Sequence, residues 1–366
     1  MTKLRDICRF QSGGTPSRGT PAYFNGNVPW ITTVALNGDV IDGNQAIEWI
    51  TDEAIAKSAA KIVPPHSVMV GTRVGIGKVA INSVPMSTSQ DIISLIGIDE
   101  NKWDKKFICH LITANKEHLT SQARGATIKG IKIEAIADLV LPEISLREQA
   151  RISEVIGKVD ALMHMHQQMA MNLEQLIKSR FIELFGDCDL THPQESWVTI
   201  KEIGSVVGGA TPKTDHDEYW GGSYRWITPA ELDADSGYIY DSVRKLTKAG
   251  VESCSLQEMP VGTVILSSRA PIGKVAIAGN TFYCNQGFKN IICKEGITPR
   301  YLYTVLLLNV EYLNSLGRGA TFKEISKGIV ESIRIPVPSM ELQEQFAAFV
   351  EQTDKSKLCG RMEVAA

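Results

Sequence analysis

Basic side chains recur at matching turns in two parts of this chain of 366 residues, and such side chains bind the phosphates of nucleic acids. Four basic residues of the first half each have a basic counterpart 194 or 196 residues later. Because sugar–phosphate geometry is the same along a duplex, two equivalent basic turns predict a shared phosphate contact. The alternative is that these side chains are only solvated beside tight turns. The candidates are Arg73, Lys78, Arg124 and Lys129, and their counterparts Arg269, Lys274, Arg318 and Lys323.

Four polar side chains recur in the same way and offer neutral hydrogen-bonding groups. Thr15 and Thr211 carry hydroxyls, and Gln90 and Gln286 carry amides, which suit a two-bond contact with adenine. We predict that they bind phosphate or base edges in DNA. An equally open alternative is that they satisfy backbone groups of their own loops.

Segments that differ between the two copies are predicted to contact the DNA bases, because two half-sites of different DNA sequence need different base contacts. Residues 17–20 differ from residues 213–216, and residues 33–43 differ from residues 229–239. Within them Arg18 and Lys213 are the best candidates for base readout.

Complete catalytic and metal-binding motifs are missing from the sequence. Residues 64–66, Pro-Pro-His, lack the Asn or Asp and the aromatic residue of an adenine methyltransferase motif, and residues 74–78 do not complete a phosphate-binding loop. His164 and His166 lie two apart on a predicted helix and point to different faces. The seven cysteines form no CxxC pair. We expect no catalytic residue, no metal and no cofactor in this chain.

Composition limits the class of protein. With 43% hydrophobic and 22% charged residues, the chain is an ordinary globular protein of two or three domains. Its net charge of −3 excludes a uniformly basic surface but not a local one. No signal peptide or membrane-length apolar run is present, so we expect a soluble, cytoplasmic protein.

One long internal repeat organises the chain. The offset between its copies is 196 residues over most of the length, 194 for an Arg-Gly-Ala-Thr segment, and 196 again for a final Glu-Gln pair, which predicts a compensating two-residue change. A unit of this size is a duplicated domain with its own core. The matched segments are 30–32 with 226–228, 76–81 with 272–277, 124–127 with 318–321, and Glu148-Gln149 with Glu344-Gln345.

A long helix is predicted between the copies, over residues 146–185. The segment has no proline and one glycine, Gly157; Ser145 and Glu148 form a capping-box signature, and Gly186 stands where a C-cap would. Apolar residues at gaps of three and four predict a coiled-coil helix that needs a partner. The predicted partner-facing seam consists of Ile152, Val155, Val159, Leu162, His166, Met169, Leu173 and Leu176.

Within each copy the pattern is that of an α+β domain. Short strands are predicted at 67–70, 78–81 and 92–96, and a helix at 103–121 is matched by one at 299–315. We therefore predict two tandem globular domains joined by a long coiled-coil helix, a pseudo-twofold repeat with a truncated second helix. The predicted boundaries are 1–143 and 188–338 for the globular domains, and 144–187 and 339–366 for the helices.

The combination of a Gly-Gly-Thr-Pro-like turn, a Trp-Ile-Thr strand, an Arg-x-x-Ile-Gly-Lys-Val loop and a closing Arg-Gly-Ala-Thr, each set followed by a long helix, resembles the DNA-specificity subunit of type I restriction–modification systems. The resemblance implies two target-recognition domains, each reading half of a split site in double-stranded DNA. It further implies that the helices dock two DNA-adenine methyltransferase subunits, and that restriction and translocase subunits join them. S-adenosylmethionine, ATP and magnesium would then belong to those partner subunits.

Two alternatives remain open from the sequence. One is a stand-alone DNA-modifying enzyme, against which the missing motifs weigh. The other is a protein–protein scaffold with degenerate DNA readers, which the balanced charge allows, since residues 1–143 sum to +1 and residues 188–338 to −1.

Overall fold

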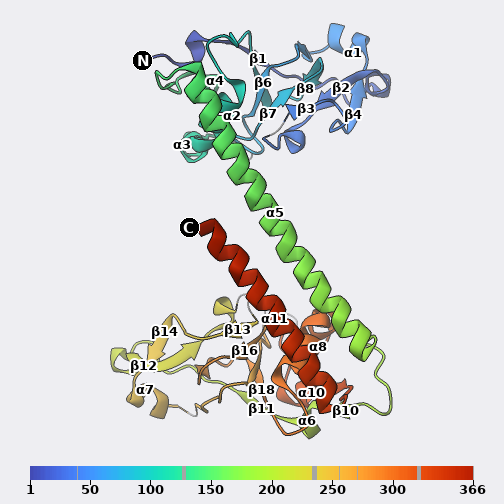
Figure 1. Cartoon of the computed structure of the whole chain (residues 1–366), viewed down its shortest axis with the longest axis vertical. Coiled ribbons are helices and arrows are strands. Elements are labelled where there is room, and N and C mark those ends of the chain that lie inside the picture. The colour runs from blue at the N-terminus through green and yellow to red at the C-terminus, as the bar shows by residue number, and fades with distance from the viewer. Residues whose placement is uncertain are drawn as a thin grey trace. The chain divides into compact units, whose positions relative to one another are not determined.

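Two compact units make up the protein, Met1–Met163 and His164–Ala366, here called the first and the second unit (Figure 1). The computed structural model describes residues 1–38, 40–125, 129–232, 237–254, 256–269, 271–319 and 323–365, with side chains up to residue 355. Each unit is described by itself.

The first unit contains two sheets. In spatial order, the larger consists of β1 (Arg9–Ser12), β9 (Ile92–Ile96), β6 (Val68–Gly71), β7 (Val79–Asn82) and β3 (Val40–Ile41), and the smaller of β4 (Glu48–Ile50), β2 (Val28–Ile31), β8 (Met86–Thr88) and β5 (Ile62–Val63). Strand β3 is parallel to β7 and β2 to β8, while the other neighbours are antiparallel. The three strands predicted for this copy are confirmed to within one residue.

The second unit repeats this topology. Its larger sheet consists of β11 (Gly204–Gly208), β18 (Lys289–Cys293), β15 (Val264–Leu266), β16 (Val275–Ala278) and β13 (Tyr238–Ile239), and its smaller one of β14 (Arg244–Leu246), β12 (Trp220–Ile227) and β17 (Tyr283–Cys284). A further pair joins β10 (Val198–Thr199) to β19 (Arg334–Ile335). The parallel pairs β13–β16 and β12–β17 correspond to those of the first unit, so the duplication inferred from the sequence is a duplication of fold.

The larger sheets are buried on both faces because their side chains alternate between two hydrophobic clusters. In β6, Val68 and Val70 pack with Ile108 of a covering helix, and Met69 packs with Ile31 on the opposite face. The central strand β15 of the second unit alternates in the same way. Continuous apolar runs are therefore strands with a core on each side.

Helices cover one face of each larger sheet. The first unit has α1 (Asp52–Ala56), α2 (Lys105–Ala114), α3 (Lys116–Ser121), α4 (Ile133–Ala137) and the 3-10 turns η1 (Leu4–Asp6), η2 (Pro21–Phe24) and η3 (Thr33–Ala35). The second unit has α6 (Ile200–Ile203), α7 (Lys248–Glu252), α8 (Pro299–Leu308), α9 (Val310–Ser315), α10 (Lys327–Ser332), η4 (Asp217–Tyr219) and η5 (Pro229–Glu231).

The helix predicted at 103–121 is two helices, and so is its match at 299–315. Each pair breaks at an asparagine, Asn115 or Asn309. The Asn115 side chain donates to the carbonyl of Leu111 at 2.8 Å, and that of Asn309 donates to Val305 at 2.9 Å. Such side-chain bonds compete with the helical ladder, which explains the break.

The long predicted helix is confirmed at both ends as α5 (Leu146–Phe185). Ser145 Oγ accepts a hydrogen bond from the Glu148 backbone N–H at 3.2 Å, so it caps the first turn. Gly186 has φ +75°, the left-handed conformation that glycine adopts without strain at a helix end.

Within the second unit, the last turns of α5 pack against α8 and the helix α11 (Met340–Ala365). Phe181 is fully buried, with its ring centroid 5.3 Å from that of Phe346 and 5.6 Å from that of Tyr301. Phe185 contacts the same two rings at 5.6 and 4.8 Å. These contacts lie beyond Leu176, the last residue of the predicted seam.

The offset at the end of the repeat is 194, and the predicted return to 196 is wrong. Gln149, not its neighbour, is buried at the start of α5, and Gln343 is buried in the same way at the start of α11. Gln345, which the sequence match pairs with Gln149, is exposed. The Glu-Gln dipeptide occurs in both helices, but burial, which the dipeptide does not reveal, selects a different register.

Candidate nucleic-acid interface

A threonine–glutamine pair stands at the same place in both units. The hydroxyl of Thr15 donates to Oε1 of Gln90, and that of Thr211 donates to Oε1 of Gln286 at 2.5 Å. Each pair joins the Gly-Gly-Thr-Pro-like turn to the loop before the β9 or β18 strand. Both glutamines are exposed, and because Oε1 is already an acceptor, the amide N–H groups are the donors that face solvent.

Close backbone contact holds this turn in place. A Cβ on Gly13 would lie 2.2 Å from the carbonyl oxygen of Ser89, and one on Gly209 would lie 2.0 Å from that of Cys284. Only glycine fits such an approach. The turn is therefore pressed onto the strand end that carries the glutamine of each pair.

The arginines of the Arg-x-x-Ile-Gly-Lys-Val loops are each paired with a carboxylate. Arg73 lies 3.5 Å from Asp91, and Arg269 donates to Glu324 at 3.0 Å. Lys289 contacts the same Glu324 at 3.1 Å. The guanidinium groups remain about half exposed, so they are held in orientation without being removed from solvent.

Partial burial alone would raise the pKa of Glu324, but hydrogen bonds from Lys289 and Arg269 outweigh it and hold this pKa below its ordinary value. Glu324 is consequently ionised at neutral pH and keeps Arg269 in place.

The two loop lysines differ, although their sequence contexts are the same. Lys274 Nζ donates to the carbonyls of Pro229 and Leu232, at 3.2 and 3.1 Å, which supports the interpretation of this lysine as a structural residue. Lys78 is exposed, and its aliphatic chain lies against Gly75. Lys78 therefore presents its ammonium to solvent.

The Arg-Gly-Ala-Thr segments close short backbone-bonded turns. Arg124 exchanges backbone hydrogen bonds with Gly130 at 2.9 and 3.0 Å, and Arg318 does so with Glu324 at 3.0 Å. Arg124 and Arg318 are exposed, as are Lys129 and Lys323, while residues 126–128 and 320–322 lie outside the described residues.

A cavity of about 730 Å³ lies beside this turn in the first unit. Arg73 and Arg124, which are 51 positions apart in the sequence, both line it, together with Lys132 and Glu134. The fold thus brings two of the predicted phosphate-binding arginines to one concave surface.

The two residues predicted for base readout lie beside aromatic rings. Arg18 sits over Phe24, with its guanidinium carbon 4.4 Å from the ring centroid, and its guanidinium also forms a two-point ion pair with Glu48. Lys213 is exposed, and its backbone carbonyl accepts a hydrogen bond from the Trp220 indole at 3.2 Å. A further arginine, Arg244, lies on Trp220 at 3.5 Å.

Sequence reasoning missed Arg244. The signal was a charge reversal, because Arg244 stands 196 residues after Glu48 at an otherwise matching position. Only the contact with Trp220 makes this reversal significant.

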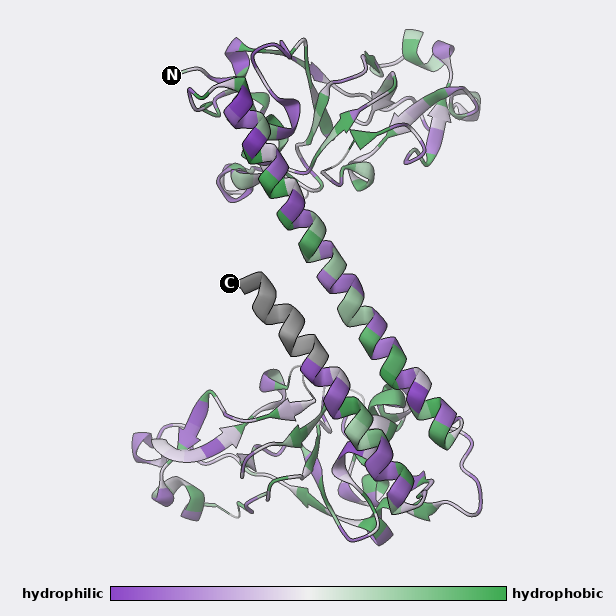
Figure 2. Ribbon diagram, in the orientation of Figure 1, coloured by the Kyte–Doolittle hydropathy of each residue, from purple (hydrophilic) through white to green (hydrophobic). Residues whose placement is uncertain are grey.

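Most of the predicted seam of α5 is exposed. Figure 2 shows hydrophobic residues interspersed with hydrophilic ones along α5. Ile152, His166 and Leu173 are half-buried. The exposed members are Val155, Val159, Leu162, Met169 and Leu176.

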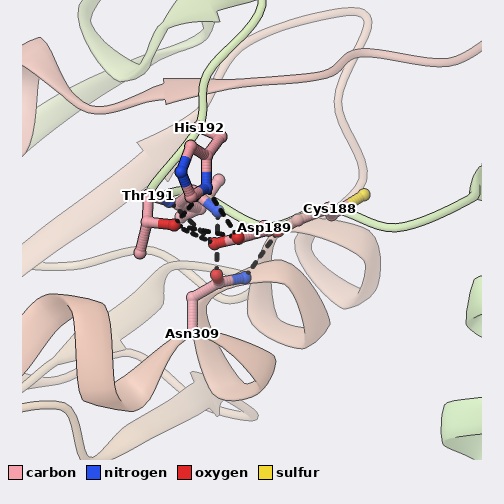
Figure 3. A network of polar contacts seen from close by, with 6 residues as sticks. Cys188, Asp189, Thr191, His192 and Asn309 are labelled. Carbon is pink, nitrogen blue, oxygen red and sulfur yellow. Dashed lines mark hydrogen bonds and ion pairs between the residues drawn. The ribbon is translucent and has the colours of Figure 1, made fainter.

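A cluster in the segment that follows α5 has the residue types of a hydrolytic triad but not its geometry (Figure 3). His192 Nδ1 lies 3.0 Å from Asp189 and 2.7 Å from the Thr191 hydroxyl, so both partners meet one ring nitrogen. A triad needs the carboxylate and the nucleophile on opposite nitrogens. Hydrogen bonds from Thr191, followed by His192, lower the pKa of Asp189 to about 2.

The backbone on either side of Asp189 is anchored by an asparagine. Asn309, at the α8–α9 break, donates to the carbonyl of Cys188 at 2.9 Å and accepts from the Leu190 N–H at 3.0 Å (Figure 3). The chain that leaves α5 is thereby fastened to the core of the second unit.

The fully buried thiols of the described residues are inert. Burial raises the pKa of Cys109 and of Cys284 to about 12, so these thiols stay protonated. The described residues contain no group of three His, Cys, Asp or Glu side chains placed to hold a metal. No described helix is long and apolar enough to cross a membrane.

These features define a class of protein with a duplicated α+β unit, a long helix after each copy, and matching polar turns on two cores. The sequence model of the type I restriction modification DNA specificity domain matches residues 1–175 and 195–359. The chain belongs to this family, and the resemblance and fold class expected from the sequence are confirmed.

Several relatives support this assignment. The chain is 42% identical over 185 residues to the type I restriction enzyme MjaIX specificity subunit of Methanocaldococcus jannaschii, covering 49% of this chain and 43% of the relative. It is 30% identical over 166 residues to the EcoR124I/EcoR124II specificity subunit of Escherichia coli, covering 43% and 40%. Both matches span less than half of the relative. A putative MjaX specificity subunit is 23% identical over 97% of this chain and 86% of its own length.

Solved structures share the fold. The S subunit of a type I restriction–modification system from M. genitalium has a TM-score of 0.60 at 16% identity, covering 100% of this chain and 91% of that one. A chain from a structure on complex assembly of the type I R-M system has a TM-score of 0.57 at 16% identity, with coverage of 100% and 92%.

Proposed function

We propose that this chain is the DNA-reading subunit of a type I restriction–modification complex, in which each unit contacts one half of a split site in double-stranded DNA. The observation that carries the proposal is the threonine–glutamine pair, which recurs on two independent cores next to exposed basic turns. A fixed local geometry at two places is what two contacts with one repeating backbone require.

The chemistry of the two turns suits DNA more than a small-molecule substrate. Gln90 and Gln286 offer amide donors, and exposed Lys78, Arg124, Lys129, Arg318 and Lys323 offer positive charge. Amides contact base edges or phosphates, and cations neutralise phosphates. The near-neutral remainder of each unit limits binding to these turns.

We assign no catalysis to this chain. Methylation and ATP-dependent cleavage would be performed by partner subunits that supply S-adenosylmethionine, ATP and magnesium. We place the two methyltransferase subunits against the long helices, where exposed apolar side chains such as Val155, Val159 and Leu162 need cover. The restriction and translocase subunits would join that core.

A salt titration tests the proposal. The full chain is mixed with a library of double-stranded DNA of random sequence, and bound molecules are sequenced at several salt concentrations. We expect two separated half-sequences and an affinity that falls steeply with salt. An affinity independent of salt would favour a protein scaffold, and methylation or cleavage by the purified chain alone would favour a stand-alone enzyme.

A further inference from the structure

Each unit carries a pair of perpendicular aromatic rings, here called its aromatic platform: Phe24 and Trp30 in the first unit, Trp220 and Trp226 in the second. The centroids of the first pair are 6.2 Å apart at 84°, and those of the second are 5.0 Å apart at 81°. The two platforms occupy equivalent positions, because Trp30 recurs as Trp226 at an offset of 196 and Trp220 stands at the same offset from Phe24.

The platform of the second unit carries Arg244. Its guanidinium carbon lies 3.5 Å from the centroid of Trp220 and 5.5 Å from that of Trp226. Stacking engages the face of the guanidinium and leaves the N–H groups at its edge available. Among the residues that the structure describes, no carboxylate pairs with Arg244, and its side chain is exposed.

The platform of the first unit carries Arg18, and its donors are already used. The guanidinium carbon lies 4.4 Å from Phe24 and 5.3 Å from Trp30. One terminal nitrogen donates to Glu48 Oε2 at 2.8 Å, and the other bonds to Glu48 Oε1. An arginine therefore lies on each platform. Arg18 is bonded to a carboxylate, whereas Arg244 has no carboxylate partner among the described residues.

Strand register places Glu48 and Arg244 at the same position. Glu48 pairs with Trp30 between β4 and β2, and Arg244 pairs with Trp226 between β14 and β12. Both β4 and β14 are edge strands of their smaller sheets. The two units thus carry opposite charges at equivalent positions of their smaller sheets, where Arg244 is exposed and Glu48 is half-buried.

Neighbouring residues extend this difference. Next to Arg244, the second unit carries Arg225 and Lys245, both within 3.2 Å of Asp241. Arg225, Lys245 and Arg244 together with Asp241 sum to a charge of +2. In the first unit, the charges of Arg18 and Glu48 cancel. The equivalent residues of the first unit, Pro29, Trp49 and Gln45, are uncharged.

An exposed apolar side chain precedes both Arg244 and Glu48 in the sequence. Val243, just before Arg244, is 86% exposed, and Ile47, just before Glu48, is 78% exposed. Apolar side chains beside hydrogen-bonding ones contact the methyl group of thymine in the major groove. Next to Arg244, the exposed Val243 therefore supplies the apolar neighbour that such a contact uses.

We propose that Arg244 reads a guanine in the half-site of the second unit, through two N–H donors held in orientation by Trp220. This inference rests on the proposed function and adds the residue that makes the two half-sites different. An arginine fork matches the O6 and N7 acceptors of guanine. The first unit presents no such fork at this point, because Glu48 occupies Arg18.

Sequencing of bound molecules from a random duplex DNA library tests this. The full chain is compared with Arg244→Lys, which keeps the charge but loses the fork, and with Arg244→Gln. The matched control is Arg151→Lys, which replaces an exposed arginine on α5. At one position of one half-site, we expect the enrichment of guanine to be at least about five-fold lower in both Arg244 variants than in the unaltered chain. The other half-site and the control should be unchanged.

The variant Glu48→Gln tests the converse, the gain of a guanine preference in the first half-site. Without the carboxylate, Arg18 remains on its platform with free donors, so the first half-site should acquire a guanine preference. Unchanged half-sequences in the Arg244 variants, or no new guanine in Glu48→Gln, would overturn this inference. If the unaltered chain enriches no sequence at all, the proposed function fails and the inference fails with it.

Discussion

Gln149 and Gln343 make the same three hydrogen bonds in the two units. Gln149 Oε1 accepts from the Asp104 N–H at 3.0 Å, and its Nε2 donates to the carbonyls of Lys102 and Ile144 at 3.1 and 3.2 Å. Gln343 Oε1 accepts from the Thr298 N–H at 2.7 Å. Each glutamine fastens the first turn of a long helix to the N-cap of the helix that covers its sheet.

Replacement of either glutamine should loosen this attachment. In Gln343→Ala, the Thr298 N–H and the carbonyls of Gly296 and Pro338 lose a buried partner. We expect the free energy of unfolding of the second unit to fall by about 2–4 kcal/mol, and that of the first unit to fall similarly in Gln149→Ala. Denaturant unfolding followed by tryptophan fluorescence measures this.

Gln345→Ala is the control, since Gln345 is exposed and its replacement should change the free energy of unfolding by less than about 0.5 kcal/mol. An equal loss in Gln345→Ala and Gln343→Ala would contradict the structural register.

Lys78 and Lys274 should give different results although their neighbours in sequence are the same. Lys78→Ala removes an exposed cation, so we expect the slope of log affinity for DNA against log salt to become less steep by about 1, with unfolding unchanged. Lys274→Ala removes the donor to Pro229 and Leu232 and should lower the free energy of unfolding by about 1–2 kcal/mol, with the salt slope unchanged. Loss of salt slope in Lys274→Ala alone would reverse our assignment.

Acid should weaken the second unit through Glu324. Its pKa is lower in the folded protein than in the unfolded chain, so its ionised form stabilises the fold above the ordinary glutamate pKa of about 4.3. This stabilisation is lost as the pH falls through the lower, folded-state pKa. Glu324→Gln should be less stable at pH 7 and lose less stability between pH 5 and pH 3. Chemical unfolding at several pH values measures both, and identical pH profiles would refute the role of Glu324.

Much of the fold follows from the sequence because local signals agree with one another. For α5, the lack of proline, the Ser145 cap and the Gly186 stop all indicate the same ends, and the structure has them. The repeat predicts equal folds, since two similar sequences bury the same apolar pattern. The breaks at Asn115 and Asn309 were not predicted, because an asparagine in a helical pattern does not reveal that its side chain donates to the carbonyl four residues earlier.

The candidate interface is harder to predict from the sequence than the fold, because its geometry depends on tertiary contacts. Thr15 and Gln90 were both predicted as binding residues, but their mutual hydrogen bond joins positions 75 apart and follows only from the fold. The different surroundings of Lys78 and Lys274 are invisible in identical local sequences. Arg244 could have been found from the Glu48 reversal, but its stacking on Trp220 could not.

Our central proposal is that each unit reads one half-site, and we further expect the length of α5, which links the two units in sequence, to set the spacing of those half-sites along DNA. Duplication of residues 157–163 adds one heptad, about 10 Å of helix, while nearly preserving the direction of each helix face. The variant and the unaltered chain are each mixed with random duplex DNA, and the bound sequences are compared. We predict the same two half-sequences with a spacer longer by about three base pairs, at 3.4 Å per pair. Altered half-sequences, or an unchanged spacer, would contradict the account.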